Sequence, residues 1–399
     1  MTVAVIAAEY NPFHNGHAYQ IAETRAAGAT HIVAIMSGNF TQRGTPAAIE
    51  KRARVRSALA GGADLIIELP LPYAMATAQR FAFGVANIAE SMGCADVLSF
   101  GSESGFLSIL QAAAHAVDNP AVCERMNELL ATGITFARAR QTAVSEICGD
   151  EIAETLGTPN DLLAVEYIRQ LELIGSSITP FAVNRIGVGH DEKKSRGEIA
   201  SASFLRALMR SGGANALNGF MPNRSLMEVK EAVNNGLAPF DSDKLETMML
   251  GVLRRMTTDE LMRLPDISEG IENRVYAAIR QACTMDEVYS FAKSKRYTAA
   301  RIRRVIMAAF LGLEDRLGQQ PPPYIRVLGF NAKGREVLAT MKNTAKLPVS
   351  DSIAFLSKVN QRCAEMVEME ARATDLYMLG LPHIRPCGFD FTAESIRNI

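Results

Sequence analysis

The chain has 399 residues, with 42 Lys and Arg against 43 Asp and Glu and a formal net charge of −1. This length predicts two or three domains. Hydrophobic residues make up 48% of the chain and charged residues 21%, a composition that excludes a disordered or fibrous protein. The balanced charge excludes a uniformly basic nucleic-acid coat, so any contact with nucleic acid must come from a local patch.

The first 190 residues alternate strand and helix patterns, which favours a Rossmann-like, doubly wound parallel sheet of the α/β class with helices on both faces. Short apolar runs predict strands at Val3–Ala8, Ile32–Met36, Asp64–Glu68, Val97–Phe100 and Ile178–Val183. Pro180 weakens the last of these. Helical patterns between the strands cover His17–Ala27, Glu50–Ala60 and Gln79–Ser91.

Beyond residue 200 the patterns become helical. The predicted helices are Phe204–Met209, Ser225–Asn234, Asp243–Arg255, Asp259–Leu264, Glu272–Thr284 and Met285–Leu313, and we expect the last to break in two. Three prolines at 321–323 then interrupt the chain. A strand at Ile325–Gly329 and a helix at Lys333–Met341 predict a small C-terminal α/β unit. We therefore predict regions at 1–200, 201–320 and 321–399.

The sequence indicates a cytoplasmic protein that meets no membrane. No apolar run approaches the roughly 20 residues of a membrane span, and the N-terminus lacks the basic segment of a secretory signal. The six cysteines are scattered without a CxxC pair or Cys/His ligand spacing, which favours reduced thiols over a zinc site. No protein partner is evident.

The segment Glu9-Tyr10-Asn11-Pro12-Phe13-His14-Asn15-Gly16-His17 stands where the first strand should end and the first helix begin. In a doubly wound sheet, ligands bind at this edge, where a helix N-terminus offers free N–H groups to phosphate. His14 and His17 are three residues apart and share one face of a helical turn. The ordinary alternative for either histidine alone is a surface residue of a turn. Together the residues resemble the HxGH signature of the nucleotidyltransferase superfamily, whose histidines stabilise a triphosphate.

That superfamily carries a second signature, ISSTxxR, and Ala200-Ser201-Ala202-Ser203-Phe204-Leu205-Arg206 is similar to it. The chain departs from the pattern at Ala200, Ala202 and Ser203. Ser201 or Ser203 alone is equally well explained as the cap of the following helix. The resemblance implies that both serines and Arg206 bind the β- and γ-phosphates, the arginine through its planar fork.

Further stretches follow predicted strands or open helices: Ser37–Gly44, Phe100–Glu103, Pro159–Tyr167 and Asn184–Gly187. With Lys295-Arg296-Tyr297-Thr298, they resemble the tRNA(Met) cytidine acetate ligase family over most of residues 1–305. This resemblance implies an enzyme that forms acetyladenylate from ATP and acetate. It then transfers the acetyl group to N4 of the wobble cytidine of elongator tRNA(Met).

The resemblance also implies the site. His14, His17 and Arg206 are the expected catalytic residues, acting on the pyrophosphate leaving group. The expected ATP-binding residues are Ala7, Ala8, Glu9, Tyr10, Asn11, Pro12, Phe13, His14, Asn15, Gly16, His17, Gln20, Gly101, Asn160, Arg185, Ser201 and Ser203. The sequence does not decide whether Gln42 and Arg43 face acetate or the cytidine.

No ligand cluster for a metal is visible, and Mg²⁺ is expected only as the companion of ATP. Asp64 and Glu68 flank a predicted buried strand, and we interpret them as a turn carboxylate and a strand-end cap.

Residues 293–305 contain six basic side chains and no acidic one. Such a run is usually a solvated face, but the resemblance favours a contact with the tRNA backbone. The expected tRNA-binding residues are Lys293, Lys295, Arg296, Tyr297, Arg301, Arg303 and Arg304, with Tyr297 available for stacking. Lys193, Lys194 and Arg196 form a smaller basic loop that would lie over ATP or touch RNA.

Two other functions remain open at this point. A small-molecule adenylyltransferase would share both phosphate motifs, although the basic segment and the residues beyond Arg206 favour a macromolecular substrate. A non-catalytic, nucleotide-binding RNA chaperone is disfavoured by the intact His14, His17 and Arg206.

Overall fold

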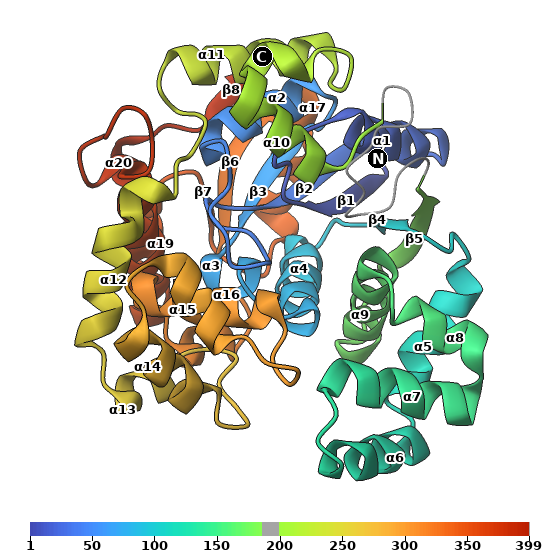
Figure 1. Ribbon diagram of the computed structural model, residues 1–399. Helices are drawn as coiled ribbons and strands as arrows, with labels where there is room; N and C mark the ends of the chain where they lie inside the picture. The colour runs from blue at the N-terminus through green and yellow to red at the C-terminus, as the bar shows by residue number, and fades with distance from the viewer. Residues whose placement is uncertain (186–198, 399) are drawn as a thin grey trace.

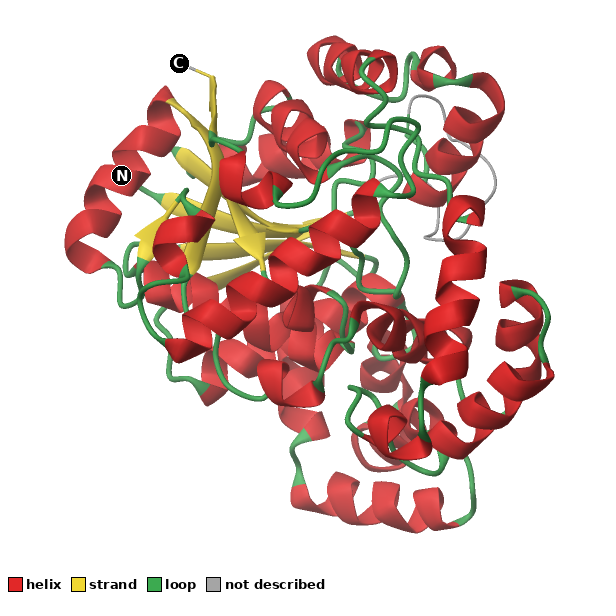
Figure 2. Ribbon diagram, turned by 90° about the vertical axis from the view of Figure 1, so that its left-hand side faces the viewer, coloured by secondary structure: helices red, strands yellow, loops and turns green. Residues whose placement is uncertain are grey.

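The computed structural model describes residues 1–185 and 199–398, and the predicted basic loop of Lys193, Lys194 and Arg196 lies outside the described residues. The described residues form one eight-stranded sheet with helices on both faces (Figures 1 and 2). The predicted α/β class is therefore confirmed. The strands are β1 (Val3–Ala8), β2 (His31–Ser37), β3 (Leu65–Leu69), β4 (Val97–Ser102), β5 (Thr179–Asn184), β6 (Ile325–Asn331), β7 (Val349–Ser350) and β8 (Ile396–Asn398).

The strand order is β5-β4-β1-β2-β3-β6-β7, with β8 also paired to β6. Strands β1 to β5 are mutually parallel where they pair, and each lies at a predicted position. The chain runs from β1 outward through β2 and β3, then returns to place β4 on the other side of β1. This reversal is the topological switch point at which such sheets bind ligands. Strand β5 ends the order of pairing, and a proline is tolerated at such an edge.

The two faces of the sheet are buried in separate clusters because successive side chains of a strand point in opposite directions. Val3 and Val5 of β1 belong to a cluster that includes residues of α4 (Ala78–Met92), α9 (Pro159–Leu173) and α19 (Gln361–Met378). Ala4 and Ile6 of the same strand belong to a second cluster with α1 (Asn15–Ala26) and α2 (Lys51–Ala60). Both faces are thus apolar and covered, which explains the continuous hydrophobic runs of these strands.

Before residue 200, the four helices α5 to α8 form a group of their own. Figure 1 shows α5 to α8 standing together beside the sheet. The helices are α1 (Asn15–Ala26), α2 (Lys51–Ala60), α3 (Leu71–Ala74), α4 (Ala78–Met92), α5 (Leu107–Val117), α6 (Pro120–Ala131), α7 (Phe136–Cys148), α8 (Asp150–Thr155) and α9 (Pro159–Leu173).

The helices after residue 200 pack in two different places. Helices α10 and α11 share a hydrophobic cluster with Ile49 and Ala53. Helices α12 to α16 form a separate hydrophobic core with α19. The predicted break within Met285–Leu313 is confirmed, because residues 293–298 separate two helices. The helices are α10 (Ala202–Gly212), α11 (Asn223–Asn234), α12 (Glu246–Arg255), α13 (Thr258–Met262), α14 (Ile271–Gln281), α15 (Met285–Ala292) and α16 (Ala299–Leu311), with 3₁₀ turns at Ala214–Leu217, Asp243–Leu245 and Asp315–Gly318.

The predicted C-terminal strand and helix are present, but they do not form a sheet of their own. Strand β6 pairs antiparallel with β3 and extends the first sheet. The remaining helices are α17 (Ala332–Thr344), α18 (Ile353–Leu356), α19 (Gln361–Met378) and α20 (Phe389–Thr392). The division at residues 200 and 320 stays a prediction. None of the described helices is long and apolar enough to cross a membrane.

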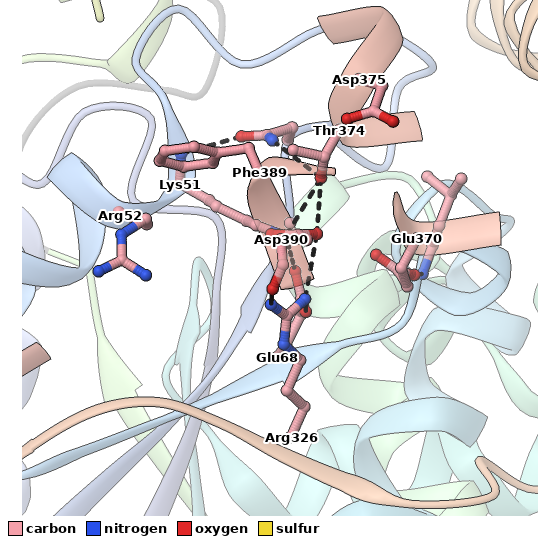
Figure 3. A network of polar contacts seen from close by, with 12 residues as sticks. Lys51, Arg52, Glu68, Arg326, Glu370, Thr374, Asp375, Phe389 and Asp390 are labelled. Atoms are coloured by element: carbon pink, nitrogen blue, oxygen red, sulfur yellow. Dashed lines mark hydrogen bonds and ion pairs between the residues drawn. The ribbon is translucent and has the colours of Figure 1, made fainter. Parts of the chain in front are cut away.

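A buried ionic network joins the N-terminal part of the chain to its C-terminal part (Figure 3). Lys51 Nζ lies 2.8 Å from Glu68 Oε1 and 2.7 Å from Asp390 Oδ2. Arg326 Nη1 lies 2.7 Å from Glu68 Oε2 and 3.2 Å from the same aspartate oxygen. Although burial alone would raise the pKa of Asp390, the two cations hold that pKa below its usual range. The network thereby fixes α2 and α20 against β3 and β6.

Glu68 is therefore not the strand-end cap that the sequence suggested, because its carboxylate binds both buried cations. Asp64 lies at the turn before β3, but its carboxylate binds groups that are distant in the sequence and not the turn itself. Its Oδ2 accepts the Ile32 N–H at 2.8 Å and an Arg25 N–H at 2.7 Å.

Replacing Lys51 by Met should lower the free energy of unfolding by about 3–5 kcal/mol, because it leaves two buried carboxylates with one cation. Urea denaturation measures this change. Lys346→Met removes a lysine whose side chain is 60% exposed and paired with Glu90, and it should have a much smaller effect. Equal effects of the two variants would contradict a structural role for the network.

Candidate active site

A cavity of about 250 Å³ lies beyond the carboxyl ends of β1 and β4, at the switch point of the sheet. It brings together segments that are far apart in the sequence, including both phosphate motifs. The predicted residues that line it are Ala7, Ala8, Glu9, Tyr10, Asn11, His14, Gly16, His17, Gln20, Gln42, Arg43, Gly101, Asn160, Arg185, Ser201, Ser203 and Arg206.

Three predicted ATP-site residues, Pro12, Phe13 and Asn15, are not among those that line it. The Phe13 ring is fully buried and packs against Gly61, where a Cβ would lie 2.3 Å from the ring. Asn15 Nδ2 donates to the Gly219 carbonyl at 2.9 Å. Phe13 and Asn15 therefore hold the loop in place from outside the cavity.

His14 and His17 cap the first helix reciprocally. His14 Nδ1 accepts the Gly16 N–H at 3.1 Å, and His17 Nδ1 accepts the His14 N–H at 3.2 Å. The two rings stack with centroids 3.8 Å apart. In each neutral ring the proton must then sit on Nε2, because Nδ1 is an acceptor. The helix start therefore fixes the tautomer of both histidines and makes each Nε2 a hydrogen-bond donor.

Both imidazoles are held neutral. Burial and the positive charges of Arg185 and Arg206 lower the pKa of His14 to about 3. Burial, His14 and Arg185 likewise hold the pKa of His17 well below its usual value. The site thus combines two neutral donors with two guanidinium groups, an arrangement suited to a polyphosphate.

The second motif closes the cavity from another side. Ser201 caps α10, since its Oγ accepts the Phe204 N–H at 3.2 Å and lies 2.9 Å from Ser203 Oγ. The expected capping role is confirmed, and both serines also line the cavity. Arg206 Nη1 donates to the Asn11 carbonyl at 2.9 Å, which ties the second motif to the first.

Two carboxylates join the end of β4 to the start of α9. Asp161 accepts the Glu103 N–H at 2.8 Å, and Glu103 accepts the Asp161 N–H at 2.9 Å. Glu103 also accepts from the Asn160 side chain. This reciprocal pair places Asn160 beside Gly101 at the cavity wall.

No pattern in the sequence pointed to Arg54, which supports the main chain at the ends of β1 and β2. Its side chain is fully buried and donates to four main-chain carbonyls, those of Glu9 (2.5 Å), Ser37 (3.2 Å), Ile49 (2.9 Å) and Gly38. The residue lies in Lys51-Arg52-Ala53-Arg54-Val55-Arg56, a pattern typical of a solvated basic helix. Tyr10, one residue beyond Glu9, adopts a left-handed φ of 47°. For a residue other than glycine this conformation costs about 1–3 kcal/mol and requires support from its surroundings.

Several apolar residues of the cavity were also missed, because hydrophobic patterns do not distinguish a core side chain from a cavity wall. They are Phe81, Phe100, Leu163, Tyr167 and Val183.

The basic segment is only partly as predicted. Tyr297 is not available for stacking, because its side chain is packed in the helical core and its hydroxyl donates to the Glu269 carbonyl. Arg301 lies over that ring and pairs with Glu269, and Arg304 pairs with Asp266. The aromatic ring therefore packs under Arg301 from inside the fold.

The other basic residues face solvent. Their side chains are exposed and form no ion pair with a described residue: Lys293, Lys295, Arg296 and Arg303.

Comparison with known proteins assigns the family. The HIGH Nucleotidyl Transferase family matches residues 1–387. A tRNA(Met) cytidine acetate ligase of Thermoanaerobacter sp. (strain X514) is 36% identical over 404 residues, covering 100% of each chain. The protein of the same name from Acetivibrio thermocellus is 33% identical, covering 99% of this chain and 100% of the other. The chain belongs to the tRNA(Met) cytidine acetate ligase family.

Two solved structures of one protein are similar to this chain over its whole length. Thermotoga maritima TmcAL in its apo form matches with a TM-score of 0.94 and 32% identity, covering 100% of this chain and 99% of that one. The same protein bound with alpha-thio ATP matches with a TM-score of 0.92 and 31% identity.

We predict that neither His14 nor His17 titrates between pH 8 and pH 5 in the free enzyme, since burial and the arginines depress both pKa values. Long-range ¹H–¹⁵N spectra of histidine-labelled protein report the tautomer and charge of each ring. His14→Gln and His17→Gln assign the signals, and free histidine in the same buffers is the control. A transition near pH 6.5 in either assigned signal would contradict this electrostatic account.

Proposed function

We propose that this chain activates acetate with ATP to form acetyladenylate and transfers the acetyl group to N4 of the wobble cytidine of elongator tRNA(Met). The proposal rests on one observation above all. The reciprocal caps of His14 and His17 leave Nε2 as the donor of each ring, and both histidines line a cavity that Arg185 and Arg206 also line.

In the first step an acetate oxygen attacks the α-phosphorus of ATP, a new P–O bond forms, and pyrophosphate leaves. Negative charge then accumulates on the leaving group, where preorganised donors lower the barrier most. His14, His17 and Arg206 are the residues that would supply these donors. Ser201 and Ser203 would hold the β- and γ-phosphates, and the apolar wall would receive a nucleobase.

In the second step the N4 amine of cytidine attacks the acetyl carbon. A C–N bond forms, the C–O bond to AMP breaks, and the amine nitrogen loses one proton. The mixed anhydride is already an activated acyl group, so this transfer needs no enzyme nucleophile. The cytoplasm, where tRNA is modified and used, is the compartment this reaction implies.

The described residues do not form a dedicated metal site. No group of three His, Cys, Asp or Glu side chains among them is arranged to hold a metal ion, and Glu9 is the one carboxylate among the described lining residues. Its Oε1 already accepts the Gln42 N–H. The donor set therefore fits phosphate better than a metal, and Mg²⁺ that enters with ATP would be held by the phosphate oxygens.

Acetate should support exchange of labelled pyrophosphate into ATP without tRNA, because adenylation precedes transfer. Measuring exchange with acetate, with longer carboxylates and with phosphorylated small molecules tests the reaction class. Exchange that requires a phosphorylated acceptor would instead identify a small-molecule adenylyltransferase.

His17→Ala should slow acetate-dependent exchange by about 10²–10³-fold, the typical cost of one missing transition-state donor. The circular dichroism spectrum and melting temperature control for the lost helix cap. His31→Ala, which alters a histidine outside the cavity, is the matched variant. A rate equal to that of the wild type would assign His17 a purely structural role.

Replacing Lys295, Arg296 and Arg303 together by Ala should weaken tRNA binding and reduce its salt dependence. Each lost phosphate contact should lower the log–log slope by about one unit. The equal-charge control replaces Lys333, Arg335 and Lys342 of α17, which are exposed on another part of the chain. Binding with the wild-type slope would show that the basic segment is only a solvated surface.

A further inference from the structure

Residues Phe40–Pro46 form a closed turn between β2 and α2, which we call the strap. The Thr41 N–H donates to the Thr45 carbonyl at 2.9 Å, and the Gly44 N–H donates to the Thr41 carbonyl at 3.0 Å. Phe40 and Pro46 are joined by an antiparallel bridge at its base. This bonding directs Gln42 and Arg43 to the tip, where both line the cavity.

The back of the strap lies directly on α16, whose position Figure 1 shows beside α15. Gly44 has a φ of 73°, and a Cβ there would lie 2.5 Å from the Arg304 nitrogen and 2.7 Å from the Arg303 carbonyl carbon. Main-chain atoms cannot retreat as a flexible side chain can. Only glycine meets both demands, the left-handed conformation and the close approach. The Phe40 ring is buried in the same core as Ile302 and Val305 of this helix.

The strap is also tied to the phosphate site. The Gln42 N–H donates to Glu9 Oε1 at 2.9 Å, and Glu9 belongs to the first motif. Behind the strap, the Tyr377 hydroxyl donates to the Ala47 carbonyl at 2.8 Å. One short segment thus contacts the cavity at its tip and the basic helix at its back.

That position indicates which substrate the strap faces. Arg303, at its contact with Gly44, is exposed and suited to an RNA phosphate. A nucleotide whose backbone lies along the basic segment would meet the strap on its way into the cavity. The Gln42 amide has both a donor and an acceptor, the pair needed to read the edge of an extruded base.

We propose that the strap forms the subsite for the acceptor nucleobase of RNA, and that Gly44 is the positioning residue that sets this subsite against α16. This inference rests on the proposed acetyl transfer to tRNA. It assigns Gln42 to the cytidine side of the cavity and not to acetate.

Gly44→Ala should separate the two half-reactions. A Cβ would push the strap away from α16, and a displacement near 1 Å at a reacting centre can cost about 10²-fold in rate. We expect acetyl transfer to tRNA to fall ten- to a hundredfold more than acetate-dependent pyrophosphate exchange. Gly175→Ala is the matched control, because Gly175 has a φ of 62° and no atom within 4 Å of its Cβ position. It introduces similar backbone strain without a clash.

Equal loss of both half-reactions in Gly44→Ala, beyond that in Gly175→Ala, would overturn the inference and assign the glycine to the stability of the fold. Transfer at the level of Gly175→Ala would overturn it as well.

Gln42→Ala provides a second test that keeps the strap backbone intact. We expect a higher KM for tRNA and an unchanged KM for acetate in the exchange reaction. A higher KM for acetate with an unchanged KM for tRNA would place acetate at the strap and overturn the inference. If the wild-type enzyme neither exchanges pyrophosphate with acetate nor acetylates tRNA, the proposed function itself fails, an outcome separate from either variant result.

Discussion

The site depends on one buried cation, Arg54, whose guanidinium binds main-chain carbonyls and pairs with no carboxylate in the part of the chain that the structure describes. Parallel strands lose their neighbours where they end, and carbonyl groups left unpaired in the interior carry a desolvation cost of about 1–3 kcal/mol each. At the ends of β1 and β2, the Arg54 guanidinium donates to the carbonyls of Glu9, Ser37 and Gly38. Its five N–H donors in a rigid fork suit this task, which a lysine ammonium could not perform with the same geometry. The fixed end of β1 in turn determines where Tyr10 turns and where His14 begins the first helix.

Much of the candidate site at the carboxyl ends of the strands could be predicted, because the sequence patterns that mark it involve residues close together in the sequence. A strand, a turn and a helix start follow within Val3–His17, and the alternation of strands and helices predicts where such turns gather. The Ser201 cap and the break before α16 are local in the same sense. Each depends on residues within a few positions of one another, where spacing along the sequence is close to spacing in space.

The features that could not be predicted depend on contacts between residues that are distant in the sequence. Lys51 and Arg54 occupy a stretch whose composition is that of a solvated helix, yet both are buried against residues that include Asp390 and Glu9. Tyr297 stands in a basic run that suggests an RNA-stacking surface, but its hydroxyl finds the Glu269 carbonyl inside the helical core. The antiparallel pairing of β6 with β3 joins segments some 260 residues apart, and no periodicity in either strand specifies that partner.

The neutral state of the two histidines has a consequence for turnover. A pair of imidazolium ions would attract the triphosphate strongly in the ground state and would hold the released pyrophosphate equally well. Interactions of equal strength in the ground state and the transition state do not accelerate a chemical step. In the proposed reaction, neutral Nε2–H donors would strengthen their hydrogen bonds as charge builds on the leaving oxygen, while Arg185 and Arg206 would supply the permanent attraction. Because the Nδ1 atoms are occupied by main-chain N–H groups, the helix start itself enforces this division of roles.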